Sequence, residues 1–122
     1  NISVLIPGAR PERLIVGGHY DTKRFGQFRF VGANDGGSSA AFLIELARAL
    51  KDRRGPLTIE LVLFDGEEYI FDPNRDRYFF GSDHFAQAYQ TGKGKHRYIA
   101  AILLDITGRC SMPVNISCHL SC

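Results

Sequence analysis

Three short apolar segments, separated by stretches long enough for helices, constrain the fold of this chain more than any other feature. They are residues 13–17 (RLIVG), 57–64 (LTIELVLF) and 98–104 (YIAAILL). Their lengths and their branched side chains indicate buried strands. Strands that alternate with helices usually lie parallel in one sheet and are joined by right-handed crossovers. The sequence therefore predicts an α/β fold, a mainly parallel sheet with helices on its faces.

Two segments between these strands have the character of helices. In residues 36–51, apolar side chains recur along one broad face, and Asp35 directly precedes them in a position to cap the helix. Ser82 is expected to cap a second helix that runs to about Gln90. The opening residues 1–6 indicate a further strand that is already under way, so we expect that residues preceding Asn1 are missing.

Composition limits the possible partners and the organisation of the chain. A length of 122 residues suits one domain, and a formal net charge of +2 gives no reason to expect nucleic acid as a partner. No apolar run approaches the ~20 residues that a membrane span needs, so no membrane insertion is expected. All three cysteines lie in residues 109–122, which fit no pattern, so we predict a domain at residues 1–108 and an atypical tail at 109–122.

Acidic side chains and one histidine lie where the predicted strands end. His19 and Asp21 follow the first strong strand, Glu67 and Glu68 follow the second, and Asp105 ends the third, while Asp35 opens the first helix. Ligands of parallel sheets bind at the carboxyl ends of strands, so these residues should meet at one edge. Imidazole and carboxylate ligands without a thiolate suit zinc or a similar divalent ion.

Each of these residues also has a simpler explanation when it is taken alone. Asp35 could be only a helix cap, the Glu67–Glu68 pair a solvated turn, and Asp105 a strand-end cap. Within a metal site, Asp21 could accept the second ring proton of the histidine and fix its tautomer. One glutamate of the adjacent pair could bind the metal while the other acts as a general base.

Six motifs together resemble the superfamily of zinc aminopeptidases and glutaminyl cyclases, the family 28 metallopeptidases. They are GHYDTK at 18–23, VGANDGGSS at 31–39, LIELARAL at 43–50, FDGEE at 64–68, FGSDHFA at 80–86 and LLD at 103–105. The resemblance covers residues 1–108 and implies a three-layer fold of the zinc exopeptidase type whose later strands are absent from this chain. It also implies one or two Zn²⁺ ions and a peptide or protein N-terminus as substrate.

The resemblance assigns a role to each candidate residue. In the aminopeptidases, the position of His19 binds one zinc, that of Asp35 bridges two, and that of Asp105 completes the first site. Glu68 corresponds to a ligand of the second zinc and Glu67 to the general base. In the cyclases one zinc is typical, held at the positions of Asp35 and Glu68 and by a later histidine. There Glu67 corresponds to the proton shuttle, and Asp105 belongs to the catalytic hydrogen-bond set.

The segment Tyr20–Lys23 and the Phe-rich loop before Gly32 resemble the cyclase branch more closely. The implied function is glutaminyl-peptide cyclotransferase activity, which forms pyroglutamate and releases ammonia. A two-zinc aminopeptidase and a catalytically incomplete metal-binding fragment are the alternatives. The chain departs from the cyclases in two respects, because it has no tryptophan and because the late histidine ligand is expected far beyond Cys122. Family members are often secreted or periplasmic, but compartment and oligomeric state stay open.

Overall fold

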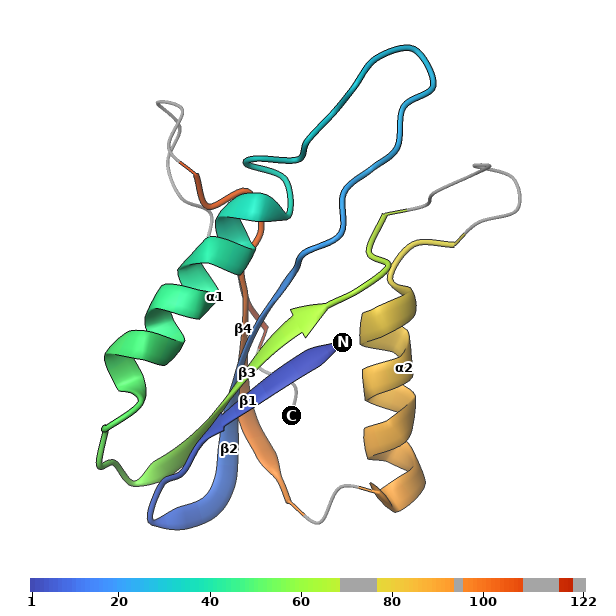
Figure 1. Cartoon of the computed structure of the whole chain (residues 1–122). Coiled ribbons are helices and arrows are strands. Elements are labelled where there is room, and N and C mark those ends of the chain that lie inside the picture. Colours follow the sequence, from blue (N-terminus) through green and yellow to red (C-terminus); the bar gives the residue numbers. More distant parts are fainter. Residues whose placement is uncertain (69–76, 94–95, 109–116, 120–122) are drawn as a thin grey trace.

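The structure of this chain, a computed structural model, describes residues 1–68, 77–93, 96–108 and 117–119 (Figure 1). Its strands are β1 (Ile2–Ile6), β2 (Arg10–His19), β3 (Leu57–Phe64), β4 (Tyr98–Leu103) and β5 (Ser117–His119). Its helices are α1 (Gly37–Leu50) and α2 (Phe80–Ala88), and a π-helical turn, η1 (Tyr89–Lys93), follows α2. The predicted succession of strands and helices is confirmed.

The five described strands form one sheet in the order β1-β3-β2-β4-β5. The central strand β2 pairs in parallel with β3 and with β4, as the helical crossovers require. The outer strands β1 and β5 pair antiparallel with β3 and β4. The α/β prediction is therefore confirmed, with a parallel centre and antiparallel flanks that make the sheet mixed.

The two helices cover opposite faces of the sheet (Figure 1). On the α1 face, Leu43 is 2% exposed and packs into a core with Leu61 and other buried aliphatic side chains. On the α2 face, the ring of Phe64 meets that of Phe85 edge to face, with centroids 5.7 Å apart. Successive residues of a strand point to opposite faces, so β3 supplies both layers of the core.

A partly buried ion pair lies on the α2 face. The carboxylate of Glu60 is almost fully buried, and its Oε2 accepts hydrogen bonds from Arg13 at 2.7 Å and from the Tyr98 hydroxyl at 2.6 Å. Burial and the hydrogen bond to this carboxylate raise the pKa of Tyr98. These two hydrogen bonds compensate the negative charge of Glu60, which would otherwise be costly to bury.

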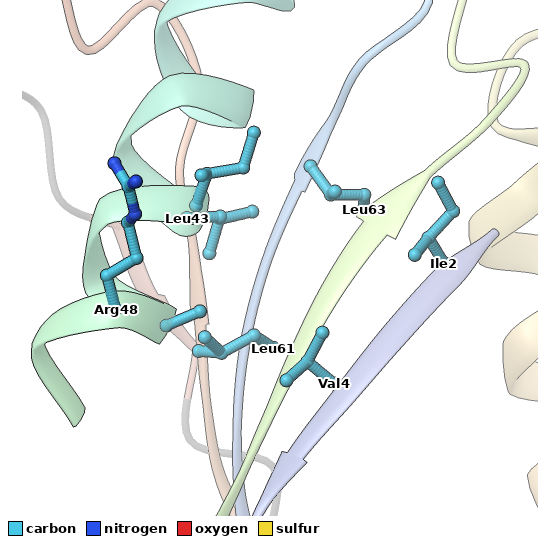
Figure 2. Close-up of a pocket in the computed structure, with 8 residues that line it drawn as sticks. Ile2, Val4, Leu43, Arg48, Leu61 and Leu63 are labelled. Carbon is cyan, nitrogen blue, oxygen red and sulfur yellow. The ribbon is translucent and has the colours of Figure 1, made fainter. Parts of the chain in front are cut away.

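An apolar groove of about 270 Å³ runs between α1 and the strands β1 and β3 (Figure 2). Ile2 and Val4 on the edge strand are about half exposed here. The residues that line the groove are Ile2, Val4, Leu43, Ile44, Ala47, Arg48, Leu61 and Leu63. None of them is a predicted site residue, so the groove is separate from the acidic end of the sheet.

Both predicted helix caps are wrong. The N-cap of α1 is Gly36, and no side chain caps this helix, because the Asp35 carboxylate lies beside His19 instead. The helix α2 begins at Phe80, two residues before Ser82. Its first N–H groups donate to carbonyls of the loop after β3, since Phe80 donates to Gly66 at 2.8 Å and Gly81 to Asp65 at 2.8 Å. Backbone carbonyls thus satisfy the donors that a capping side chain would otherwise take.

Part of the predicted tail is in the sheet, because β5 pairs with residues 101–103 of β4. The rest of residues 109–122 lies outside the described residues, so the boundary after residue 108 stays a prediction. Within the described part of the chain, no helix is long and apolar enough to cross a membrane.

Candidate metal centre

The candidate site forms where β2, β3 and β4 end and α1 begins. His19 is the last residue of β2, and Asp105 comes two residues after the end of β4. Asp35 precedes α1, and the Glu67–Glu68 pair follows β3. The parallel pairing of β2 with both neighbours brings these three strand ends to one edge, as the sequence predicts.

His19 is the centre of the cluster. Its side chain is 4% exposed, and its Nε2 lies 3.2 Å from Oδ1 of Asp35 and 3.6 Å from Oδ1 of Asp105. Ligand atoms of these three residues all lie within 4.8 Å of one another. Neither ring nitrogen has a hydrogen-bond partner among the described residues, although both are buried. Buried polar atoms are rarely left in this state, so the unpartnered Nε2 between two carboxylates suits a divalent cation.

The backbone around His19 is closely packed against the start of α1. Gly36 has a φ of +83°, and a Cβ there would lie 2.5 Å from the Asp21 carbonyl oxygen and 3.2 Å from Cε1 of His19. Only glycine adopts this conformation easily and leaves room for the ring. The fully buried hydroxyl of Ser39 donates to the His19 carbonyl at 2.9 Å. Glycine and serine together therefore fix where the imidazole lies.

Sequence reasoning gave Ser39 no role. Its position could have indicated one, because Ser39 lies four residues before Leu43 and thus on the buried face of the helix. A polar residue on such a face needs a partner, which here is the end of β2.

Asp21 lies on the Nδ1 side of the imidazole but, contrary to the expectation from the sequence, it does not accept the second ring proton. Its Oδ1 is 3.6 Å from Nδ1 of His19, which is too long for a hydrogen bond. The same carboxylate accepts the backbone N–H groups of Glu67 and Glu68, each at 3.0 Å, one on each oxygen. Asp21 therefore joins the loop after β2 to the loop after β3, a role that the sequence did not suggest.

Glu67 faces the cluster without being one of its three closest members. Its Oε2 lies 3.8 Å from Nδ1 of His19, and its side chain is 24% exposed. Burial raises the pKa of Glu67, the nearby imidazole lowers it, and the carboxylates of Glu68, Asp105 and Asp21 raise it further. A carboxyl group with a raised pKa beside a metal position is suited to accept and return a proton.

Glu68 does not join the three-residue cluster. Its Oε2 accepts a hydrogen bond from Nζ of Lys23 at 2.9 Å, and the two side chains are 11% and 18% exposed. The ammonium group also lies 3.1 Å from the hydroxyl of Tyr78. The predicted convergence thus holds for His19, Asp35 and Asp105, whereas Glu68 is held in an ion pair. Lys23 contacts the site, which sequence reasoning missed, and the signal for it was its position two residues after Asp21.

The profile of Peptidase family M28 matches residues 1–117. This chain belongs to peptidase family M28. It is 35% identical to the glutaminyl-peptide cyclotransferase-like protein of Bos taurus, over 88% of this chain and 32% of that protein. It is 38% identical to the glutaminyl-peptide cyclotransferase of Bos taurus, over 70% of this chain and 27% of that protein. The chain therefore spans about a third of the length of these relatives, or less.

Solved structures agree with this M28 assignment. The glutaminyl cyclase of an Acidobacteriales bacterium superposes with a TM-score of 0.76 and 34% identity, over 88% of this chain and 38% of that one. The glutaminyl cyclase of Fimbriiglobus ruber superposes with a TM-score of 0.70 and 42% identity, over 80% of this chain and 38% of that one. A Zn-dependent exopeptidase from Parabacteroides distasonis shares the fold, with a TM-score of 0.65 and 24% identity, over 82% and 38%.

The residues of this M28 chain fit a zinc ion. One buried imidazole nitrogen and two carboxylates match the number and type of the protein ligands that catalytic zinc sites use. These are also the three residues that the resemblance assigns to the first zinc of the aminopeptidases. The number of zinc ions and the part that Glu68 takes in binding them stay predictions.

Proposed function

We propose that the protein to which this chain belongs is a zinc-dependent glutaminyl-peptide cyclotransferase that acts on peptide or protein N-termini. The observation that supports it most directly is the buried His19, whose unpartnered Nε2 lies between two carboxylates. The two bovine relatives and the two bacterial cyclase structures share 34–42% identity with this chain, and their names favour the cyclase reaction.

In the proposed reaction the α-amine attacks the side-chain amide carbon of an N-terminal glutamine. A carbon–nitrogen bond forms in the ring, the amide carbon–nitrogen bond breaks, and ammonia leaves. A bound zinc would be held by His19, Asp35 and Asp105, with Glu68 as a further candidate ligand, and would stabilise negative charge on the amide oxygen. Because both reacting groups belong to one substrate, holding them close supplies much of the rate.

Glu67 is the proposed proton shuttle. It takes a proton from the attacking amine and returns it to the leaving nitrogen, which requires a pKa closer to the working pH than that of an exposed carboxyl group. Its burial beside other carboxylates raises its pKa in that direction. Asp21 holds the backbone of Glu67 in place.

A two-zinc aminopeptidase is the second candidate. One specific observation favours it. The three residues that cluster most closely are His19, Asp35 and Asp105, and the resemblance assigns these three to the first zinc of the aminopeptidases. The two candidates differ in their products, since an aminopeptidase releases an amino acid and uses water as its second substrate.

The test uses the longest gene product that contains these residues, loaded with zinc, and a peptide with an N-terminal glutamine. We expect ammonia and a peptide with a pyroglutamyl end, detected by mass spectrometry. Glu67→Gln should lower turnover by roughly 10²- to 10⁴-fold and leave zinc binding in place. Glu45→Gln, at an exposed position of α1, is the matched control and should change nothing. Release of free glutamine would support the aminopeptidase instead. If the protein forms neither the pyroglutamyl peptide nor free glutamine, both proposals are contradicted.

The 122-residue chain by itself is expected to bind at most one zinc weakly and to catalyse neither reaction. The described residues supply three close ligands, and the resemblance places a further histidine beyond the end of the chain. Turnover by this chain alone would show that it contains a ligand that the cluster does not include, with His119 as the first residue to test.

A further inference from the structure

The loop between β2 and α1 closes on itself beside the candidate site. It leaves the site at Asp21, returns to it at Asp35, and extends beyond that edge of the sheet (Figure 1). These two aspartates lie on the Nδ1 and the Nε2 sides of His19, so the loop is anchored within the site. Its ends also meet, because a Cβ at Gly32 would lie 2.7 Å from Oγ1 of Thr22. Compact loops with closed ends are frequently functional.

Three phenylalanines form a cluster within this loop. The ring of Phe25 stacks on that of Phe28, with centroids 4.7 Å apart, and meets the ring of Phe30 edge to face at 5.4 Å. Phe25 is partly buried, whereas Phe28 and Phe30 are 56% and 37% exposed. The contacts with Phe25 therefore hold two rings in place while much of their surface stays open to a ligand.

The charge of the loop is opposite to that of the site. Residues 22–34 contain Lys23, Arg24 and Arg29 and no acidic residue. The lysine is paired with Glu68, whereas both arginines are exposed. Neither arginine forms an ion pair within the described part of the chain. A ligand that passes from the site over this loop thus meets aromatic rings and guanidinium groups, which bind aromatic side chains and carboxylates.

We propose that the loop of residues 22–32 binds the substrate peptide beyond its first residue and selects peptides with an aromatic or acidic side chain there. The inference rests on the proposed function, because it takes the substrate to be a peptide N-terminus, and it holds for cyclisation and for hydrolysis alike. The reacting end of the peptide lies at the acidic cluster around His19. The residues that follow leave along the edge from which the loop extends, so the loop flanks their path.

An anionic membrane surface would also attract exposed phenylalanines and arginines. The carboxylates at the base of the loop argue against it, because a surface of the same sign repels them. They belong to Asp21, Asp35, Glu67, Glu68 and Asp105. A peptide brings its positive amine to these carboxylates and its own side chains to the loop. The peptide therefore matches both parts of this surface, whereas a membrane matches only the loop.

The test compares three amidated peptides, Gln-Ala-Ala, Gln-Phe-Ala and Gln-Ala-Glu, on the zinc-loaded longest gene product that contains these residues. We expect kcat/KM to be roughly three- to tenfold higher for Gln-Phe-Ala than for Gln-Ala-Ala, from a ring contact. For Gln-Ala-Glu we expect about a two- to fivefold gain, because an exposed ion pair contributes less. Both gains should come from a lower KM, because these contacts lie away from the reacting atoms.

Variants of the loop assign each preference to its side chains. Phe28→Ala combined with Phe30→Ala should remove the preference for phenylalanine, and Arg24→Gln combined with Arg29→Gln should remove that for glutamate. Phe28→Tyr keeps the ring and should keep the first preference, and lysine at both arginine positions keeps the charge and should keep most of the second. Circular dichroism verifies folding, and Phe28→Ala alone, at the more exposed position, is used if the double alanine variant does not fold.

Two matched controls remove the same side chains elsewhere. Phe42→Ala removes a ring that is 48% exposed on α1, and Arg54→Gln removes an exposed charge between α1 and β3, away from the site. Both should leave the two preferences unchanged. A loss of preference in these controls would show that the peptide lies on another surface and would overturn the proposal.

Equal kcat/KM values for the three peptides in the wild type, or preferences that survive in the alanine and glutamine variants, would also overturn it. Binding to phosphatidylserine vesicles that these variants abolish, without any peptide preference, would show a membrane contact instead. Release of free glutamine in place of pyroglutamyl products would refute the proposed function, and the same three rates would still test this inference. If neither product forms, affinities for the three peptides, measured by calorimetry, replace the rates and decide it in the same way.

Discussion

Asp21 gives the sharpest test of how the candidate site is assembled. Its two oxygens accept the N–H groups of Glu67 and Glu68, both at 3.0 Å, and its side chain is 12% exposed. In Asp21→Asn, one oxygen remains an acceptor, but the bond is no longer charge-assisted. The new side-chain NH₂ group is a donor, so it cannot bind the second backbone N–H, which loses its acceptor. A weakened bond costs about 1 kcal/mol and an unpaired, partly buried N–H about 1–3 kcal/mol, so we expect a loss of about 2–4 kcal/mol.

Urea unfolding of the metal-free chain in a chelator measures this loss. Asp52→Asn removes the same charge from an exposed position and should change the unfolding free energy by no more than about 0.5 kcal/mol. Zinc affinity is the second readout, and it should fall because the Asp21 carboxylate also places a negative charge 3.6 Å from Nδ1 of His19. An Asp21→Asn chain with wild-type stability would refute the reasoning, since the carboxylate would then not hold the two glutamates.

Two further predictions concern the two faces of the sheet. Leu43→Ala should lower the unfolding free energy by about 2–5 kcal/mol because Leu43 is 2% exposed, and Ile44→Ala, at a half-exposed position beside it, should cost far less. Tyr98→Phe should cost about 1.5–3 kcal/mol, because it removes a hydrogen bond to the charged Glu60. The pKa of Tyr98 is raised in the folded state, so its contribution is complete below pH 10.0, the ordinary value, and is lost as the pH rises above it. The difference in unfolding free energy between wild type and Tyr98→Phe, measured by urea unfolding, should therefore shrink above that pH. A difference that stays constant would contradict the hydrogen bond as its cause.

The fold could be predicted because its main signals are local. The run at residues 57–64 has the same bounds as β3, and the helix predicted at 36–51 differs from α1 by one residue at each end. The caps failed because they depend on distant partners. Ser82 can be rejected as a cap only when it is known that the carbonyls of Asp65 and Gly66 already accept the first N–H groups of α2. Those bonds exist only after β3 and the helix have packed together.

The candidate site divides in the same way. The convergence of His19, Asp35 and Asp105 follows from the rule that parallel strands end at one edge, so the pattern of strands was enough to predict it. The position of Glu68 depends on Lys23, and a pairing between side chains 45 residues apart leaves no periodic signal in the sequence. Strand order predicts which residues approach the site, whereas individual ion pairs decide which of them face it.

The divergence of Glu67 and Glu68 follows from how their backbone is held. Asp21 accepts both N–H groups, so the two residues are fixed side by side at the backbone while their carboxylates separate. One carboxylate comes within 3.8 Å of Nδ1 of His19, and the other binds Lys23. Two adjacent glutamates thereby acquire different environments, one beside carboxylates that raise its pKa and one beside a cation that compensates it. Asp21 and Lys23 are therefore the residues that make the two members of this Glu-Glu pair different.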